Sequence, residues 1–195
     1  MDLLGERAFE NNLKKKTSMF RNADHALSWA YETIEKPIVK LSSINGMRWE
    51  PTRGLPNGLL IGLTAEDLHR QAANIISMVS QLEDTAAQEY IAAKFGNRHQ
   101  KESLRILAYR GCAALGVGPD SSDAVYKVIK GYFVGNGTYR DARKALKCRD
   151  QYALMARKCI YETLDIIYHQ SMADMANIFQ EQGLIASSER MYSNR

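Results

Sequence analysis

This sequence lacks the common signatures of catalysis. No segment matches the phosphate-binding pattern GxxxxGK[ST], the dinucleotide pattern GxGxxG, the metalloprotease pattern HExxH or the nucleophile pattern GxSxG. The four histidines lie far apart, and none has a second histidine or a cysteine at the spacing of a helical metal site. We therefore expect no enzymatic activity, no cofactor and no metal.

Cysteine is scarce, and no hydrophobic run is long. The three cysteines are odd in number and widely spaced, which indicates reduced thiols rather than a disulfide framework. No apolar run could span a bilayer, and the amino terminus lacks the apolar stretch and cleavage site of a secretory signal. We expect a cytoplasmic protein without membrane contact.

Proline is scarce too, and three of the four prolines fall within residues 37–63. Elsewhere apolar residues recur at intervals of three and four, which is the helical period. The pattern predicts an all-α protein, a multi-helix bundle with a C-terminal helix-turn-helix and a long final helix. The predicted divisions are an N-terminal helix plus long basic loop (1–63), a helical core (64–135), the helix-turn-helix with the long helix (136–183) and a frayed tail (184–195).

Capping residues and glycines predict the helix boundaries. Thr64 with Asp67 is typical of a capping box, and Gln88 is placed to complete another at the start of Thr85–Phe95. The predicted helices are Asn22–Glu35, a helix opened by Thr64, Thr85–Phe95 ending at Gly96, Gln100–Leu115, a helix capped by Ser121 or Ser122 and ending before Gly135, and one or two helices over 150–182.

The long connection 37–63 allows two interpretations. It either packs its apolar residues over a core, or it forms a basic and aromatic arm that contacts nucleic acid or a protein. Arg48 and Arg53 are the contacts that the second interpretation suggests.

Most of the net charge lies between Thr138 and Lys158. This stretch has seven basic and two acidic residues, a net charge of +5 in a chain whose total is +4. Concentrated positive charge on a helical unit is typical of a nucleic-acid contact, although solvated helix faces are often basic as well.

The same stretch has the pattern of a helix-turn-helix. Thr138, with Asp141 three residues later, is expected to cap a first helix, and Asp150 to cap a second. Lys147 and Cys148 fall in the turn, which contains no glycine. A residue with a side chain then has to adopt positive φ there, at a cost of about 1 kcal/mol, unless a longer or differently shaped turn avoids that cost.

A recognition helix inserts its amino-terminal end into the major groove, where Arg and Gln read bases while other cations contact phosphates. The predicted contacts with double-stranded DNA are Arg140, Arg143, Lys144, Lys147, Arg149, Gln151, Tyr152, Arg157 and Lys158. A second basic run suggests accessory contacts at Arg98, Lys101 and Arg105, beside the alternative of a solvated helix face.

The charge then reverses, because the segment 159–183 has four acids and no Lys or Arg. Its apolar residues Met172, Met175, Ile178 and Phe179 are either core or a seam for homodimerisation and docking. Two alternatives to DNA binding therefore remain: a helical protein-protein interaction protein, and an enzyme whose site is assembled from scattered polar residues.

The segment TYRDARKALKCRDQYALMARKCIYETLDII, residues 138–167, resembles the C-terminal helix-turn-helix of phage and prophage late-gene regulators, the antiterminator class whose motif is similar to sigma-factor region 4. The resemblance implies transcription regulation, with binding to a promoter-proximal DNA element and contact with RNA polymerase. It also implies that Arg149, Gln151 and Tyr152 face the DNA.

Overall fold

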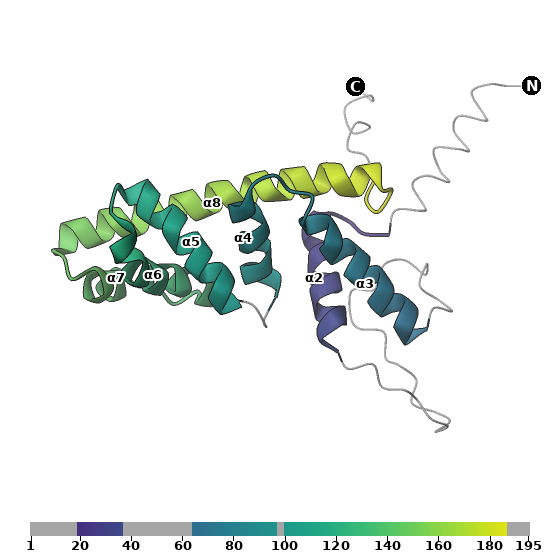
Figure 1. Cartoon of the computed structure of the whole chain (residues 1–195), viewed down its shortest axis with the longest axis horizontal. Coiled ribbons are helices and arrows are strands. Elements are labelled where there is room, and N and C mark those ends of the chain that lie inside the picture. Colours follow the sequence, from purple (N-terminus) through teal and green to yellow (C-terminus); the bar gives the residue numbers. More distant parts are fainter. Residues whose placement is uncertain (1–18, 37–63, 97–99, 187–195) are drawn as a thin grey trace, which may run out of the picture. The chain divides into compact units, whose positions relative to one another are not determined.

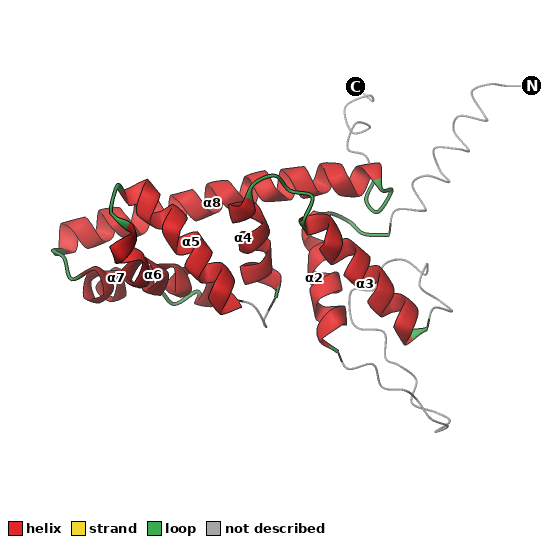
Figure 2. Ribbon diagram, viewed as in Figure 1, coloured by secondary structure: helices red, strands yellow, loops and turns green. Residues whose placement is uncertain are grey.

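The computed structural model describes residues 19–36, 64–96 and 100–186. Regular structure over these residues is helical (Figure 2), apart from one bridge between Phe20 and Ile185, and this confirms the all-α prediction. The helices are α2 (Ala23–Glu35), α3 (Ala65–Val79), α4 (Thr85–Phe95), α5 (Gln100–Leu115), the 3₁₀ turn η1 (Pro119–Ser121), α6 (Ser122–Val134), α7 (Tyr139–Leu146) and α8 (Asp150–Glu181). The loop 37–63, with Arg48 and Arg53, lies outside the described residues, as does Arg98.

The chain divides into two compact units. Unit 1 comprises residues up to Met78 and from Asp174 onward, and unit 2 comprises Val79–Ala173. The grouping differs from the sequence-based divisions because α8, a single helix of 32 residues, contributes to both units.

Unit 1 contains α2, nearly all of α3 and the end of α8. Met175 and Phe179 are fully buried, so these two side chains belong to a core and not to an exposed seam. Leu184 and Ile185, predicted to lie in a frayed tail, are ordered: the Leu184 carbonyl accepts from the Phe20 amide at 3.0 Å, and Ile185 is buried.

Unit 2 packs α4, α5, α6 and α7 along the first part of α8 (Figure 1). The inward face of α8 is apolar at helical spacing, and each buried large side chain contributes about 1.5–3 kcal/mol. The buried residues on this face are Ala153, Ala156, Ile160, Leu164 and Ile167, as the sequence pattern predicts.

Most predicted helix boundaries are confirmed, and the predicted cap of α4 is corrected. Thr64 and Asp67 form a reciprocal capping box, with the Asp67 amide 3.2 Å from the Thr64 hydroxyl. The cap of α4 is Asp84 and not Thr85, since the Asp84 carboxylate accepts from the Ala86 amide at 2.9 Å. Gln88 instead donates to the Leu82 carbonyl at 2.7 Å, because its side chain points back along the preceding turn.

The junction between α6 and α7 depends on two glycines. The Gly137 amide donates to the Gly131 carbonyl at 3.0 Å. A Cβ on Gly131 would lie 2.8 Å from the Gly137 Cα, closer than real Cβ contacts allow. Two backbones meet here without side chains between them, which only glycine permits.

Gly131→Ala is therefore expected to lower the free energy of unfolding by about 1–3 kcal/mol, although alanine normally favours a helix. Urea denaturation of the full chain measures this. Gly118→Ala is the control, because φ at Gly118 is −67° and nothing lies within 4 Å of the added Cβ. Equal unfolding midpoints for the two variants would contradict the role given to Gly131.

Candidate nucleic-acid interface

Helix α7 has one buried face and one basic face. Ala142 is buried and Ala145 and Leu146 are half-buried, whereas Arg140, Arg143 and Lys144 are exposed. Eight residues are too few for a helix to be stable by propensity alone, so packing and capping maintain it. The packed face thus directs the cations outward.

The start of α7 has the predicted cap. The Thr138 amide donates to the Asp141 carboxylate at 3.1 Å, and the Asp141 amide donates to the Thr138 hydroxyl at 3.3 Å. The hydroxyl and amide of Thr138 hold the pKa of Asp141 below its ordinary value, since both donate to the ionised carboxylate. The amides of Thr138 and Asp141 are therefore occupied within the protein.

The turn that follows contains the predicted strained residue. Lys147 has φ 49° and ψ 43°, and it is the only residue other than glycine with positive φ in the described ranges. The left-handed conformation costs about 1 kcal/mol for a residue with a Cβ. Three residues separate α7 from α8, a length typical of helix-turn-helix units.

Asp150 does not cap the second helix as predicted. It is the first residue of α8, and the preceding Arg149 carbonyl accepts from the Ala153 amide at 2.9 Å. The Asp150 carboxylate instead pairs with Arg143 at 3.1 Å, and both side chains are more than half exposed. Such an exposed pair contributes about 0–1 kcal/mol, so Arg143 can exchange this partner for another anion.

Arg157 differs from the other eight proposed contacts because its side chain is half-buried and binds a backbone carbonyl and an aromatic ring. Its Nε donates to the Gly137 carbonyl at 3.1 Å, and its guanidinium lies 4.4 Å from the centre of the Tyr161 ring. These contacts hold the segment before α7 against α8. We therefore assign Arg157 to the fold.

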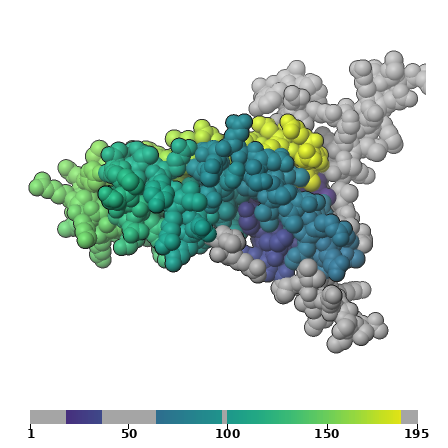
Figure 3. Space-filling model, viewed as in Figure 1, coloured from purple at the N-terminus to yellow at the C-terminus, as the bar shows by residue number. Residues whose placement is uncertain are grey.

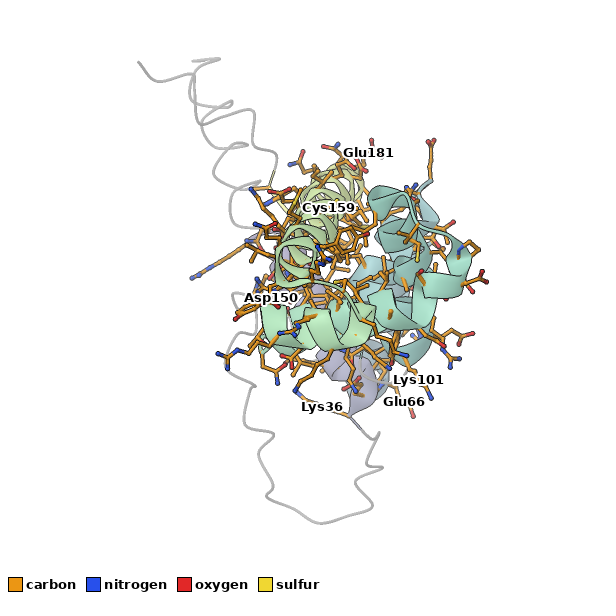
Figure 4. All side chains as sticks on the ribbon, turned by 90° about the vertical axis from the view of Figure 1, so that its left-hand side faces the viewer. Lys36, Glu66, Lys101, Asp150, Cys159 and Glu181 are labelled. Atoms are coloured by element: carbon orange, nitrogen blue, oxygen red, sulfur yellow. The ribbon has the colours of Figure 1, made fainter. Side chains whose placement is uncertain are left out.

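The remaining predicted contacts are exposed at the amino-terminal end of α8 and on α7. Figure 4 looks along α8 from this end, with Asp150 in front of Cys159. Tyr152 is 46% exposed, and Lys158 lies 3.6 Å from Glu162 in an exposed pair. The exposed residues are Arg140, Arg143, Lys144, Lys147, Arg149, Gln151, Tyr152 and Lys158.

Two lysines of α6 extend the basic surface, and the sequence analysis missed them. Lys127 and Lys130 line a shallow pocket of about 240 Å³ together with Thr138 and Asp141. Lys127 and Lys130 are three residues apart on the helix that precedes the basic unit, and this spacing could have predicted them as part of the surface. In Figure 3 the atoms at this end of unit 2 are coloured green.

The accessory basic run has a mixed environment. Lys101 and Arg105 are exposed on α5. Lys94 lies 3.8 Å from the centre of the Tyr168 ring, and Arg110 pairs with Asp84 at 3.0 Å. The run is thus partly engaged in contacts inside unit 2.

A hydrogen-bonded chain of side chains connects helices α4, α6 and α8 of unit 2. The Tyr132 hydroxyl donates to the Asp165 carboxylate at 2.6 Å and lies 2.9 Å from the Tyr90 hydroxyl. Burial, followed by the bond to Asp165, raises the pKa of Tyr132 well above its ordinary value. His169 lies four residues after Asp165 on α8, but the hydrogen-bond donor to Asp165 is Tyr132 of α6.

No group of residues in the described ranges could hold a metal ion, and no described helix is long and apolar enough to cross a membrane. Comparison with known proteins found no matching protein family, curated protein or solved structure.

Tyr132→Phe is expected to lower the free energy of unfolding by about 1–3 kcal/mol, because Asp165 and Tyr90 lose a partner. Urea denaturation measures this, with the exposed Tyr109→Phe as a control expected to change it by less than about 0.5 kcal/mol.

The folded state binds the Tyr132 proton more tightly than the unfolded state, whose pKa is near 10.0. The contribution of Tyr132 to the free energy of unfolding should be fully present below that pH and fall above it. The free energy of unfolding should therefore fall less steeply with rising pH in Tyr132→Phe than in the wild-type chain. Identical slopes above pH 10 would contradict the proposed coupling.

Arg157→Ala and Lys158→Ala remove one charge each from neighbouring positions, but only the first removes contacts that organise the fold. Arg157→Ala should cost about 1–3 kcal/mol of stability, and Lys158→Ala less than about 0.5 kcal/mol. Thermal or urea unfolding distinguishes the two variants. Equal losses would show that Arg157 does not hold the junction.

Proposed function

We propose that this chain binds double-stranded DNA through the exposed basic surface of α7 and the start of α8, and that it regulates transcription without catalysis. The observation that supports this most is the row of cations on one side of a helix whose other side is packed in the core. Arg140, Lys144, Lys147 and Arg149 are exposed together on α7 and the turn.

The exposed cations suit a polyanionic partner. Their ion pairs with protein groups are few and exposed, so phosphate oxygens can replace water or weak partners at little cost. Lys127 and Lys130 add positive charge beside the start of α7. Phosphate contacts from this surface would orient the protein on the duplex.

The start of α8 offers groups for base recognition. Arg149 can donate two hydrogen bonds to guanine, and Gln151 can make two with adenine. Each such pair discriminates between bases by about 1–3 kcal/mol. Tyr152 is exposed next to them and can contact bases or phosphates. A short α7, a three-residue turn and an exposed helix start are compatible with a helix-turn-helix mode of docking.

The resemblance to phage and prophage late-gene regulators makes the proposal more specific. It suggests an antitermination role at a promoter-proximal element, with RNA polymerase as a protein partner, and a cytoplasmic location follows from that role. The acidic residues farther along α8 would face away from phosphate or toward a basic protein surface.

A protein-protein interaction function is the second candidate, favoured by one observation. Leu154 and Met155 are 55% and 70% exposed at the start of α8, which is unusual for large apolar side chains beside a cationic surface. Salt distinguishes the two candidates, because apolar docking does not weaken steeply as ionic strength rises.

Fluorescence anisotropy of the full chain with random-sequence duplex DNA at several salt concentrations tests the proposal. The variant with Arg140→Ala, Lys144→Ala and Arg149→Ala should bind more weakly, and the slope of log affinity against log salt should fall in magnitude by about 3. Removal of three cations from unit 1, by Arg21→Ala, Lys36→Ala and Arg70→Ala, is the matched control. Wild-type affinity and slope in a folded triple variant of α7 and α8 would exclude this surface.

A further inference from the structure

The outward face of α8 in unit 2 is a continuous exposed strip. Its residues are Met155, Lys158, Glu162, Ile166 and His169, all of them exposed. Helix α5 contacts one flank of α8, where the Cys159 thiol lies 3.5 Å from the Ala114 carbonyl. Helix α6 contacts the other flank through Tyr132 and Asp165. The strip is thus the side of α8 that these helices leave uncovered.

The strip contains two large apolar side chains on one line. Met155 is 70% exposed and Ile166 is 57% exposed. They are eleven residues apart, which is about three helical turns and about 16 Å. Lys158 and Glu162 lie between them and form an ion pair at 3.6 Å. The order along the helix is therefore apolar, positive, negative, apolar.

We propose that a second copy of this chain docks on this strip, with the two α8 helices antiparallel about a twofold axis near residues 160 and 161. This arrangement places Met155 opposite Ile166 of the second copy. It also brings Lys158 near Glu162 of the second copy, so the strip is complementary to itself in its apolar contacts and in its charges.

Charge selects the antiparallel orientation. A parallel pair would place Lys158 against Lys158 and Glu162 against Glu162, and like charges facing each other are unfavourable. The antiparallel pair also places the basic start of α8 beside the acidic part of the second helix. An acidic or basic peptide would complement only one half of the strip, which favours a second copy as the occupant.

One consequence rests on the proposed function. Arg149 lies about 11.5 residues from the axis, so the two copies would present their turns about 34 Å apart along the helix direction. This distance is one turn of B-DNA, the spacing at which dimeric helix-turn-helix proteins contact two half-sites. Lys158 would then face the second copy, and α7, Arg149 and Tyr152 would face the DNA.

Sedimentation velocity of the full chain without DNA, up to about 100 μM, tests the dimer apart from any DNA binding. The wild-type chain should sediment as a dimer, and Ile166→Glu should weaken association at least about tenfold, because it places a charge in an apolar contact. Tyr109→Glu is the matched control, because Tyr109 is 57% exposed but lies on α5, outside the strip. A monomer at the highest concentration, or a dimer insensitive to Ile166→Glu, would overturn the proposal.

Charge reversal and cross-linking test the orientation. Lys158→Glu and Glu162→Lys should each weaken the dimer, and the double variant should restore it. In a Cys148→Ser, Cys159→Ser background, chains with Met155→Cys should form a disulfide with chains carrying Ile166→Cys, but not with chains carrying Tyr109→Cys. Cross-linking of Met155→Cys chains to one another instead would exclude the antiparallel dimer. Loss of DNA binding in the anisotropy experiment would leave these results unchanged, so the two proposals can fail separately.

Discussion

The close contact of two backbones, at Gly131 and Gly137, determines where the basic surface of unit 2 lies. The Gly137 amide bonds to α6 and its carbonyl to Arg157 on α8, so one glycine connects three helices. Helix α7 begins directly after this point, and its direction follows from the junction. The exposed cations of α7 share one side because they recur at three- and four-residue spacing, and the junction fixes the direction in which that side points. A side chain at either glycine would separate the backbones and remove that constraint.

The cations of this region have two different physical roles. Arg157 is half-buried against Tyr161 and a carbonyl, where its charge and its planar group stabilise the fold. Arg143 and Lys158 make exposed ion pairs, which contribute little to stability. Exposed positive charge that does not stabilise the protein is available for an anionic partner. This difference explains why we propose DNA contacts at exposed positions of α7 such as Arg143 and not at Arg157.

Helix α8 shows how similar residues acquire opposite roles. Met175 and Phe179 are fully buried in unit 1, whereas Met155 is 70% exposed and Ile166 57% exposed in unit 2. Hydrophobicity alone ranks the first pair as the better candidates for a docking surface, because they lie in the more apolar part of the helix. Packing reverses that order. The self-complementary strip becomes visible only after α5 and α6 are placed on the two flanks of the helix.

The sequence by itself determined the class and most boundaries of the helices, because caps, glycines and apolar periodicity act over a few residues. It also predicted the Thr138 cap, the left-handed residue in the turn and the inward stripe of α8, which depend on local geometry. Only the tertiary structure decided that Arg157 binds Gly137, that Asp165 accepts from Tyr132, and that Lys127 lies beside α7. These partners are 20 or 33 residues apart in the two hydrogen bonds, and no local pattern specifies which distant groups meet. The physical reason is that side-chain partners depend on how the helices pack, whereas the helices themselves form from neighbouring residues.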